Sequence, residues 1–192
     1  MAGVKRLIIG ISGASGASYG LAALEMARAA GCETHLVVSR SALLTLHQEL
    51  GLQKADLVGR ADEIHPTADV GASIASGSFQ TEGMLIAPCS VRTMSEIATG
   101  VTSTLMSRAA DVVLKERRRL VLMVRETPLH LGHLETMTAL TRIGAVVMPP
   151  VPAFYAKPQT LDEMVAHSVA RALDLFGIET GRIKRWEGMK TA

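Results

Sequence analysis

Residues 10–18 read GISGASGAS, and this stretch of small residues decides how the N-terminal part of the chain folds. The apolar run Leu7–Ile11 leads into it and is typical of a buried strand. Residues Tyr19–Ala30 follow it and, being rich in Ala, Leu and Met without Pro, predict a helix. A strand, a small-residue turn and a helix N-terminus form an anion site, because free backbone N–H groups and the helix dipole face the ligand. We therefore expect a phosphorylated cofactor at this first strand–helix junction.

The glycine spacing of this loop is G-x-x-G-x-x-G, which differs from the G-x-G-x-x-G spacing of dinucleotide-binding loops. No Lys-Ser or Lys-Thr follows the last glycine, so the loop is not a Walker loop either. A tight turn with a serine cap on the helix is the alternative interpretation. The loop by itself leaves both interpretations open.

Short apolar runs alternate with helical stretches along the chain. Strands are predicted at Leu7–Ile11, Thr34–Val38, Met84–Ala87, Leu120–Val124 and Ala145–Met148. Helices are predicted at Ser18–Ala30, Ser41–Leu50, Thr93–Thr99, Thr104–Arg117, Leu134–Arg142 and Leu161–Phe176. This alternation predicts an α/β fold with a doubly wound, mostly parallel sheet, in a single domain over residues 1–192.

The amino-acid composition favours a protein of several subunits and argues against a membrane or secreted protein. The chain is 48% hydrophobic, which is high for a soluble monomer, so we expect other subunits to cover apolar surface. No apolar stretch approaches the roughly 20 residues of a membrane span, and the run after Lys5 and Arg6 is too short for a signal peptide. Cys32 and Cys89 form neither a disulfide framework nor a metal motif, so we expect a reducing cytoplasm.

The charge pattern argues against a nucleic-acid partner. The net charge is only +2 and aromatic residues make up 3% of the chain, whereas nucleic-acid binders carry basic stripes and stacking rings. The one basic run, at residues 115–119, is explained by the end of a helix, where cations are favoured. We expect neither a nucleic acid nor a membrane as partner.

Polar residues gather where the predicted strands end. Ligands of such sheets bind beyond the carboxyl ends of the strands. The segments found there are Gly13–Gly16, Ser39, Pro88–Thr93, Arg125-Glu126 and the loop around Phe154-Tyr155. The hydroxyls of Ser39, Ser90 and Thr93 either cap three helices independently or form a polar cradle for a mononucleotide, and both interpretations stay open.

Several charged residues are further candidates. Arg108 and Lys115 are two turns, about 10 Å, apart on one predicted helix, with Asp111 between them. This spacing favours a surface ion-pair ladder, although the two cations could also bind a phosphate, including one across a subunit boundary. Arg125-Glu126 follows a strand directly, so phosphate binding by the Arg and proton relay by the Glu compete with a mutual ion pair.

No metal centre is predicted. His130, His133 and Glu135 have loose metal-ligand spacing, but it is not a recognised zinc arrangement, and a helix-start cluster without metal is favoured.

Seven motifs follow one another in a fixed order through nearly the whole chain. They are GISGASGASYG at 10–20, ASGSF at 75–79, APCS at 87–90, RAADVVLKERR at 108–118, LVLMVRETPL at 120–129, GAVVMPPVPAFY at 144–155 and VARALDLFGI at 169–178. In these motifs the chain resembles the UbiX-like flavin prenyltransferases, within the superfamily of homo-oligomeric flavin-containing cysteine decarboxylases. The resemblance implies a Rossmann-like, flavodoxin-type domain in a dodecamer with FMN at a subunit junction.

The resemblance also implies roles for individual residues. FMN would contact Gly13, Ala14, Ser15, Ser39, Ser90, Val91, Arg92, Thr93 and Arg125. Dimethylallyl phosphate would contact Arg108, Lys115, Glu126, Tyr155 and Arg171. The catalytic residues would be Ser15, Glu49, Lys115 and Glu126, and Trp186 would help to close the site. One departure is Val91-Arg92, where many members of the family have Thr-Gly.

The implied reaction joins a dimethylallyl group to N5 and C6 of reduced FMN. The prenylated FMN would then serve a UbiD-type decarboxylase, in ubiquinone synthesis or in aromatic-acid breakdown. Fixed cations would stabilise the departing phosphate in place of a metal, and Glu49, Glu126 or the phosphate itself would relay the proton. The alternatives are oxidative decarboxylation of a cysteine-terminated substrate and a non-catalytic FMN carrier. Residues 71–78 lack the His of the cysteine decarboxylases, which favours the prenyltransferase.

Overall fold

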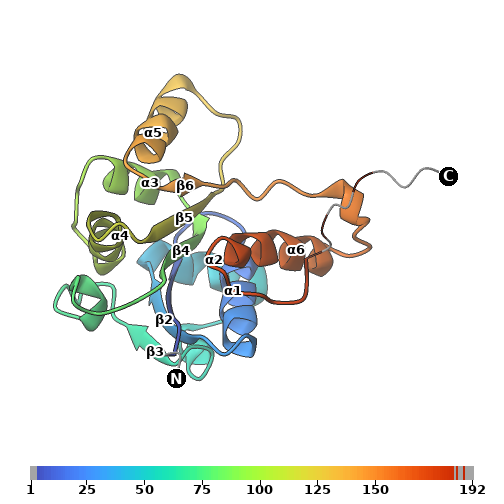
Figure 1. Cartoon of the computed structure of the whole chain (residues 1–192), viewed down its shortest axis with the longest axis horizontal. Coiled ribbons are helices and arrows are strands. Elements are labelled where there is room, and N and C mark those ends of the chain that lie inside the picture. The colour runs from blue at the N-terminus through green and yellow to red at the C-terminus, as the bar shows by residue number, and fades with distance from the viewer. Residues whose placement is uncertain (1–3, 184, 186–187, 189–192) are drawn as a thin grey trace.

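The computed structural model describes residues 4–183, 185 and 188. In this part of the chain, parallel strands form one sheet in the order β3-β2-β1-β4-β5-β6 (Figure 1). The strands are β1 (Arg6–Ile11), β2 (Glu33–Val38), β3 (Glu63–His65), β4 (Gly83–Cys89), β5 (Arg119–Val124) and β6 (Val146–Val147). The strand order reverses between β1 and β4, which is the switch point where sheets of this kind bind ligands. The predicted doubly wound parallel sheet is confirmed.

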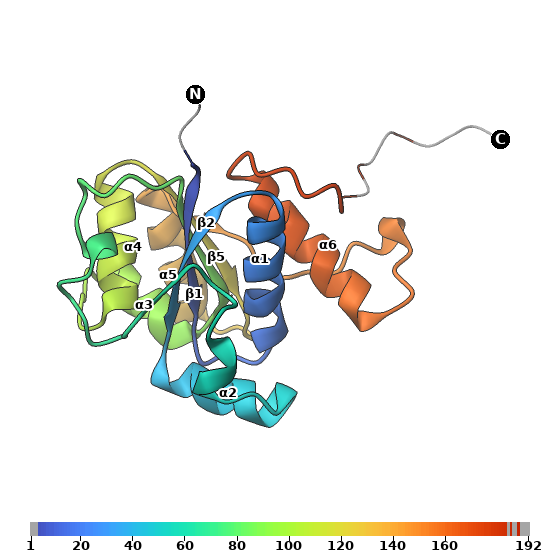
Figure 2. The same ribbon diagram turned by 90° about the horizontal axis from the view of Figure 1, so that it is seen from below.

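Helices cover both faces of the sheet (Figure 2). One face packs against α1 (Ala17–Ala29), α2 (Arg40–Leu50) and α6 (Leu161–Asp174), and the other against α3 (Val91–Ala98), α4 (Leu105–Lys115) and α5 (Leu131–Arg142). Successive strand residues point to opposite faces, so Ile9 joins the first core and Ile8 the second. Both side chains are almost completely buried, which stabilises the fold by about 1.5–3 kcal/mol each. Burial on both faces explains why the strands are apolar almost throughout.

The packing of α1 depends on a glycine in its second turn. A Cβ at Gly20 would lie 2.5 Å from the carbonyl oxygen of Ala87 in β4 and 2.6 Å from the side chain of Ile11 in β1. Only a residue without a side chain lets the helix approach these strands so closely. The N-terminus of α1 is thereby held directly over the switch point.

The structure differs from the sequence prediction mainly at short elements. Strand β3 was not predicted, because its sequence Glu-Ile-His offers only one apolar residue. Helix α5 begins at Leu131, three residues before the predicted Leu134, and β6 is shorter than the predicted Ala145–Met148. The irregular segments hold the short 3₁₀ turns η1 (Lys54–Leu57), η2 (Ser73–Ala75) and η3 (Phe154–Ala156).

Candidate functional site

Three helices begin around one cavity at the carboxyl ends of the strands. The Ser39 hydroxyl caps α2 by accepting from the N–H of Ala42 at 3.1 Å. The Ser90 hydroxyl caps α3 in the same way, and Thr104 caps α4. The cavity has a volume of about 290 Å³ and is lined by Gly13, Ser39, Arg40, Ser41, Thr67, Ser90, Arg92, Thr93, Glu96, Thr104 and Met106. Helix N-termini carry partial positive charge, so this cavity favours an anion.

Five of the predicted FMN contacts line this cavity: Gly13, Ser39, Ser90, Arg92 and Thr93. The two interpretations of the hydroxyls are therefore compatible, since Ser39 and Ser90 cap helices and also face the cavity. The Arg92 side chain is 77% exposed and pairs with Glu96 one turn later at 2.9 Å.

A buried serine fixes the floor of the switch point. The hydroxyl of Ser12, which is 1% exposed, donates to the carbonyl oxygen of Pro88 at 2.8 Å and accepts from the N–H of Ser90 at 2.7 Å. The loop after β1 is thus joined to the loop after β4. Sequence reasoning missed this residue and also Ser41, Thr67 and Thr104, although Ser12 lies within the loop that it singled out. Thr104 could have been found as a hydroxyl at the start of the predicted helix Thr104–Arg117, where such residues cap the helix.

The N-terminus of α1 already holds an anion, which is the carboxylate of Glu49. Its oxygens accept from the N–H of Gly16 at 3.0 and 3.1 Å and from the N–H of Ala17 at 3.0 Å. Gly16 adopts a left-handed conformation, φ 101°, that suits glycine. The sequence predicted a cofactor phosphate at this junction. The structure instead fills it from within the chain, because α2 packs beside α1 and brings its last turn to the loop.

The environment of Glu49 favours its charged form. Burial opposes the charge, but the Ser15 hydroxyl, the two backbone amides and the Arg125 guanidinium outweigh it and lower the pKa of Glu49. The backbone N–H of Arg125 is itself held by the carbonyl oxygen of Cys89 at 3.0 Å. Two predicted site residues, Ser15 and Arg125, therefore both stabilise the carboxylate of a third, Glu49.

The predicted phosphate ligands do not form one cluster within a single chain. Arg108 on α4 pairs with Asp111 at 2.8 Å, whereas Lys115 at the end of α4 pairs with Glu116 at 2.5 Å. Asp111 thus pairs with only one of the two cations that it was predicted to bridge. Arg171 lies on α6, on the opposite face of the sheet from α4 (Figure 2).

Other predicted residues have simpler surroundings. The Glu126 carboxylate accepts from the N–H of Thr127 at 3.0 Å, and no ion pair joins it to Arg125 among the described residues. Tyr155 lies in η3 with its ring 5.9 Å from that of His167. Val91 packs against the second core, and Ala14 lies in the turn before α1. Trp186 lies outside the described residues.

The comparisons with known proteins agree over most of the chain. The model of a family described as Flavoprotein matches residues 1–173. Flavin prenyltransferase UbiX of Neisseria meningitidis serogroup B is 59% identical over 186 residues, which cover 97% of this chain and 98% of that protein. The chain belongs to the UbiX family of flavin prenyltransferases.

Solved structures of the UbiX family have the same fold. The crystal structure of AnUbiX (PadA1) in complex with FMN and dimethylallyl pyrophosphate has a TM-score of 0.95 and 44% identity, covering 98% of this chain and 100% of that one. The dodecameric FMN-dependent UbiX-like decarboxylase from Escherichia coli O157:H7 has a TM-score of 0.92 and 48% identity, covering 95% and 100%. Membership of this family makes the enzyme a transferase that prenylates a flavin, and decides against the cysteine-decarboxylase and carrier alternatives.

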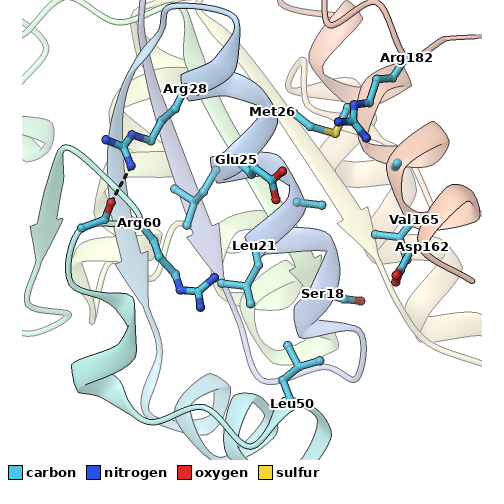
Figure 3. A pocket seen from close by; sticks show the side chains of 14 residues that line it. Ser18, Leu21, Glu25, Met26, Arg28, Leu50, Arg60, Asp162, Val165 and Arg182 are labelled. Carbon is cyan, nitrogen blue, oxygen red and sulfur yellow. Dashed lines mark hydrogen bonds between the residues drawn. The ribbon is translucent and has the colours of Figure 1, made fainter.

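This UbiX-family chain also has a larger cavity between α1 and α6 (Figure 3), with a volume of about 540 Å³. Its walls include the apolar Leu21 and Val165 and the acidic Glu25 and Asp162. None of the predicted site residues lines it, and Arg28, Arg60 and Arg182 stand beside its two carboxylates. The cavity under the helix N-termini is therefore the better candidate site, although it is smaller.

The structure also bears on a metal site at His130 and His133 and on membrane-spanning helices. The rings of His130 and His133 stack at 3.6 Å, and within the described part of the chain their donor atoms form no metal-binding group with Glu135. Among the described residues, no helix combines the length and the apolar composition needed to cross a membrane.

Proposed function

We propose that this enzyme joins the dimethylallyl group of dimethylallyl phosphate to N5 and C6 of reduced FMN and releases prenylated FMN. The observation that carries the proposal is the cavity where α2, α3 and α4 begin, next to the group of Ser15, Glu49 and Arg125. The related AnUbiX structure, in complex with FMN and dimethylallyl pyrophosphate, supports FMN and a phosphorylated dimethylallyl donor as the ligands. We further propose that residues 1–192 act as one FMN-binding domain.

The donors around the cavity fit the phosphate of FMN. The N-terminus of α1 is occupied by Glu49, so the flavin phosphate binds instead where α2 and α3 begin, at the hydroxyls of Ser39, Ser90 and Thr93. Gly13 lets the first loop approach α2, because a Cβ there would lie 2.3 Å from the Cβ of Ser41. Reduced FMN, when bound, supplies electron-rich N5 and C6 atoms. Ala14, Ser15 and Arg125 then border the flavin ring, and Val91 and Arg92 contribute mainly through the start of α3.

The phosphate of the prenyl donor needs cations from more than one chain. Arg108 and Lys115 lie on α4 and Arg171 on α6, so we propose that a homo-oligomer, a dodecamer, completes the clamp together with Tyr155. A guanidinium has five N–H donors, so Arg108 can bind phosphate while it keeps Asp111. Such preorganised donors stabilise the negative charge that develops on the departing phosphate. The E. coli O157:H7 relative is described as dodecameric, which supports this assembly.

The Ser15–Glu49 pair is suited to stabilise the positive charge that develops on the allyl group as the phosphate leaves. A carboxylate held in its charged form stabilises the developing allylic cation by Coulomb attraction. Because the Ser15 proton points to Glu49, the serine oxygen presents its lone pairs outward, where they can accept a proton. Glu126, at the end of β5, is the second group that can move a proton. We also propose that the enzyme works in the cytoplasm and delivers its product to a UbiD-type decarboxylase.

Anaerobic incubation with reduced FMN and dimethylallyl phosphate, followed by mass analysis of the flavin, tests this function. The expected result is a flavin whose mass has increased by one dimethylallyl unit, and dimethylallyl diphosphate in a parallel incubation shows which donor is preferred. An unmodified flavin together with consumption of a cysteine-terminated peptide would contradict the proposal.

A further inference from the structure

Two buried histidines and a glutamate meet at the β2–β3 edge of the sheet, where these strands lie side by side (Figure 1). His35 of β2 pairs with Glu63 of β3, and His65 lies two residues after Glu63, so all three side chains share one face. His35 Nδ1 lies 3.0 Å from His65 Nε2 and 3.3 Å from a carboxylate oxygen of Glu63. The histidine side chains are 1% and 4% exposed, and that of Glu63 is 55% exposed.

The hydrogen positions on these rings cannot satisfy every contact while both histidines are neutral. His35 Nε2 faces Glu33 at 3.1 Å, and His65 Nδ1 faces the other oxygen of Glu63 at 3.5 Å. Each neutral ring has a single N–H, so every choice of tautomers leaves at least one pair of acceptors facing each other. Placing both N–H groups toward the carboxylates leaves no proton between His35 Nδ1 and His65 Nε2, which lie 3.0 Å apart, or between His35 Nδ1 and the Glu63 oxygen at 3.3 Å. A cation among these three atoms removes the conflict.

We propose that His35, Glu63 and His65 bind a divalent transition-metal ion, with Zn²⁺ as the best fit to two imidazoles and a carboxylate. The three donor atoms lie within 4.8 Å of one another. Tetrahedral zinc has bonds of about 2.0–2.1 Å and therefore separates its ligands by about 3.3 Å, close to the distances found here. The exposed side of Glu63 leaves a path for the ion and room for water as the fourth ligand.

The surroundings support a metal ligand role for His35. Its Nε2 faces Glu33, which is itself held by Arg6 at 3.0 Å, and a carboxylate behind a ligating histidine fixes the tautomer and raises its basicity. The ring of Phe79 packs edge-on against the ring of His35, with 5.1 Å between the ring centroids. The sequence did not single out this group, because 30 residues separate the two histidines and β3 was not predicted.

The ion would be structural. Strand β3 has three residues and pairs with β2 alone, so a metal across the two strands would fasten the edge of the sheet. The chain continues from His65 to Thr67, which lines the flavin cavity. The site is separate from the prenyl-transfer chemistry and does not depend on it.

Zinc titration of the FMN-loaded, full-length enzyme after EDTA treatment and desalting tests the site. A fluorescent zinc indicator measures competition, and thermal unfolding is followed with and without Zn²⁺. We expect one zinc ion per chain and a higher unfolding temperature with zinc. Glu33→Gln should weaken binding by about 10–100-fold, and His65→Gln and Glu63→Gln should weaken it further. His130→Gln, which removes a histidine outside the group, should bind zinc as the unchanged enzyme does.

Three results would overturn the proposal. The first is the absence of zinc binding at micromolar concentrations, and the second is equal binding by Glu63→Gln and His130→Gln. The third is stabilisation by mild acid alone without any effect of zinc, which would assign the cluster to a shared proton. If His65→Gln does not fold, the exposed Glu63→Gln still decides the outcome.

Discussion

Replacing Ser12 with alanine removes the one hydroxyl that joins the loops after β1 and β4. The N–H of Ser90 loses its partner at 2.7 Å, whereas the carbonyl oxygen of Pro88 keeps the backbone N–H of residue 12 at 3.2 Å. One part-buried donor therefore loses its partner, which costs about 1–3 kcal/mol when water cannot replace it. We expect Ser12→Ala to lower the free energy of unfolding by about 1 kcal/mol, the low end of that range, because Ser90 lines the cavity. FMN should also bind more weakly, because Ser90 begins α3 at the wall of the cavity.

Urea unfolding of the FMN-free protein measures the first effect, and fluorescence titration with FMN measures the second. Ser78→Ala is the matched control, since Ser78 is exposed and its hydroxyl lies 2.9 Å from the hydroxyl of the exposed Ser76. Its free energy of unfolding should change by less than about 0.5 kcal/mol. A Ser12→Ala protein as stable as this control, with unchanged FMN affinity, would refute the role given to the hydroxyl.

Three further substitutions test the helix packing, the internal anion and the phosphate clamp. Gly20→Ala should destabilise the fold by about 1–3 kcal/mol or more, because its Cβ would meet the carbonyl of Ala87 at 2.5 Å; an unchanged urea midpoint would contradict this. Glu49 has a lowered pKa in the folded protein, so its contribution to stability is present above the ordinary glutamate value of about 4.3 and is lost as the pH falls through the folded value. Glu49→Gln should therefore be less stable than the unchanged protein at pH 7, and this difference should shrink as the pH falls below the ordinary glutamate value. A difference independent of pH would exclude the charge as its cause. Lys115→Ala should slow flavin prenylation by about 10²–10³-fold while FMN still binds. The control Lys54→Ala should react at the normal rate, and a normal rate for Lys115→Ala would show that Lys115 does not bind the phosphate.

The order of elements could be predicted because it depends on local patterns. Apolar runs too short for buried helices alternate with helical stretches, and an α/β fold with a parallel sheet accommodates that alternation. Strand β3 could not be predicted in this way, because Glu63 and His65 are polar and take their places only by pairing with β2. Tertiary contacts, and not the pattern of the segment, make these residues a strand.

Some residues of the candidate site could likewise be predicted from the sequence, whereas others depend on tertiary contacts. Ser39 and Ser90 follow predicted strands and precede predicted helices, so their convergence on one cavity follows from topology. The capture of the α1 N-terminus by Glu49 depends on how α2 packs against α1, which spacing in the sequence does not reveal. Arg108 and Arg171 lie on opposite faces of the sheet, so whether they share a phosphate depends on the assembled oligomer.

Mixed oligomers of Arg108→Ala and Arg171→Ala chains test the shared clamp most directly. The two variants are co-expressed with different affinity tags, purified through both tags and incubated anaerobically with reduced FMN and dimethylallyl phosphate. If one arginine comes from each of two chains, random mixing restores both to about a quarter of the sites. The mixture should then prenylate FMN although neither variant does so alone. A mixture as inactive as its two parents would show that both arginines must come from one chain, against their placement on opposite faces of the sheet.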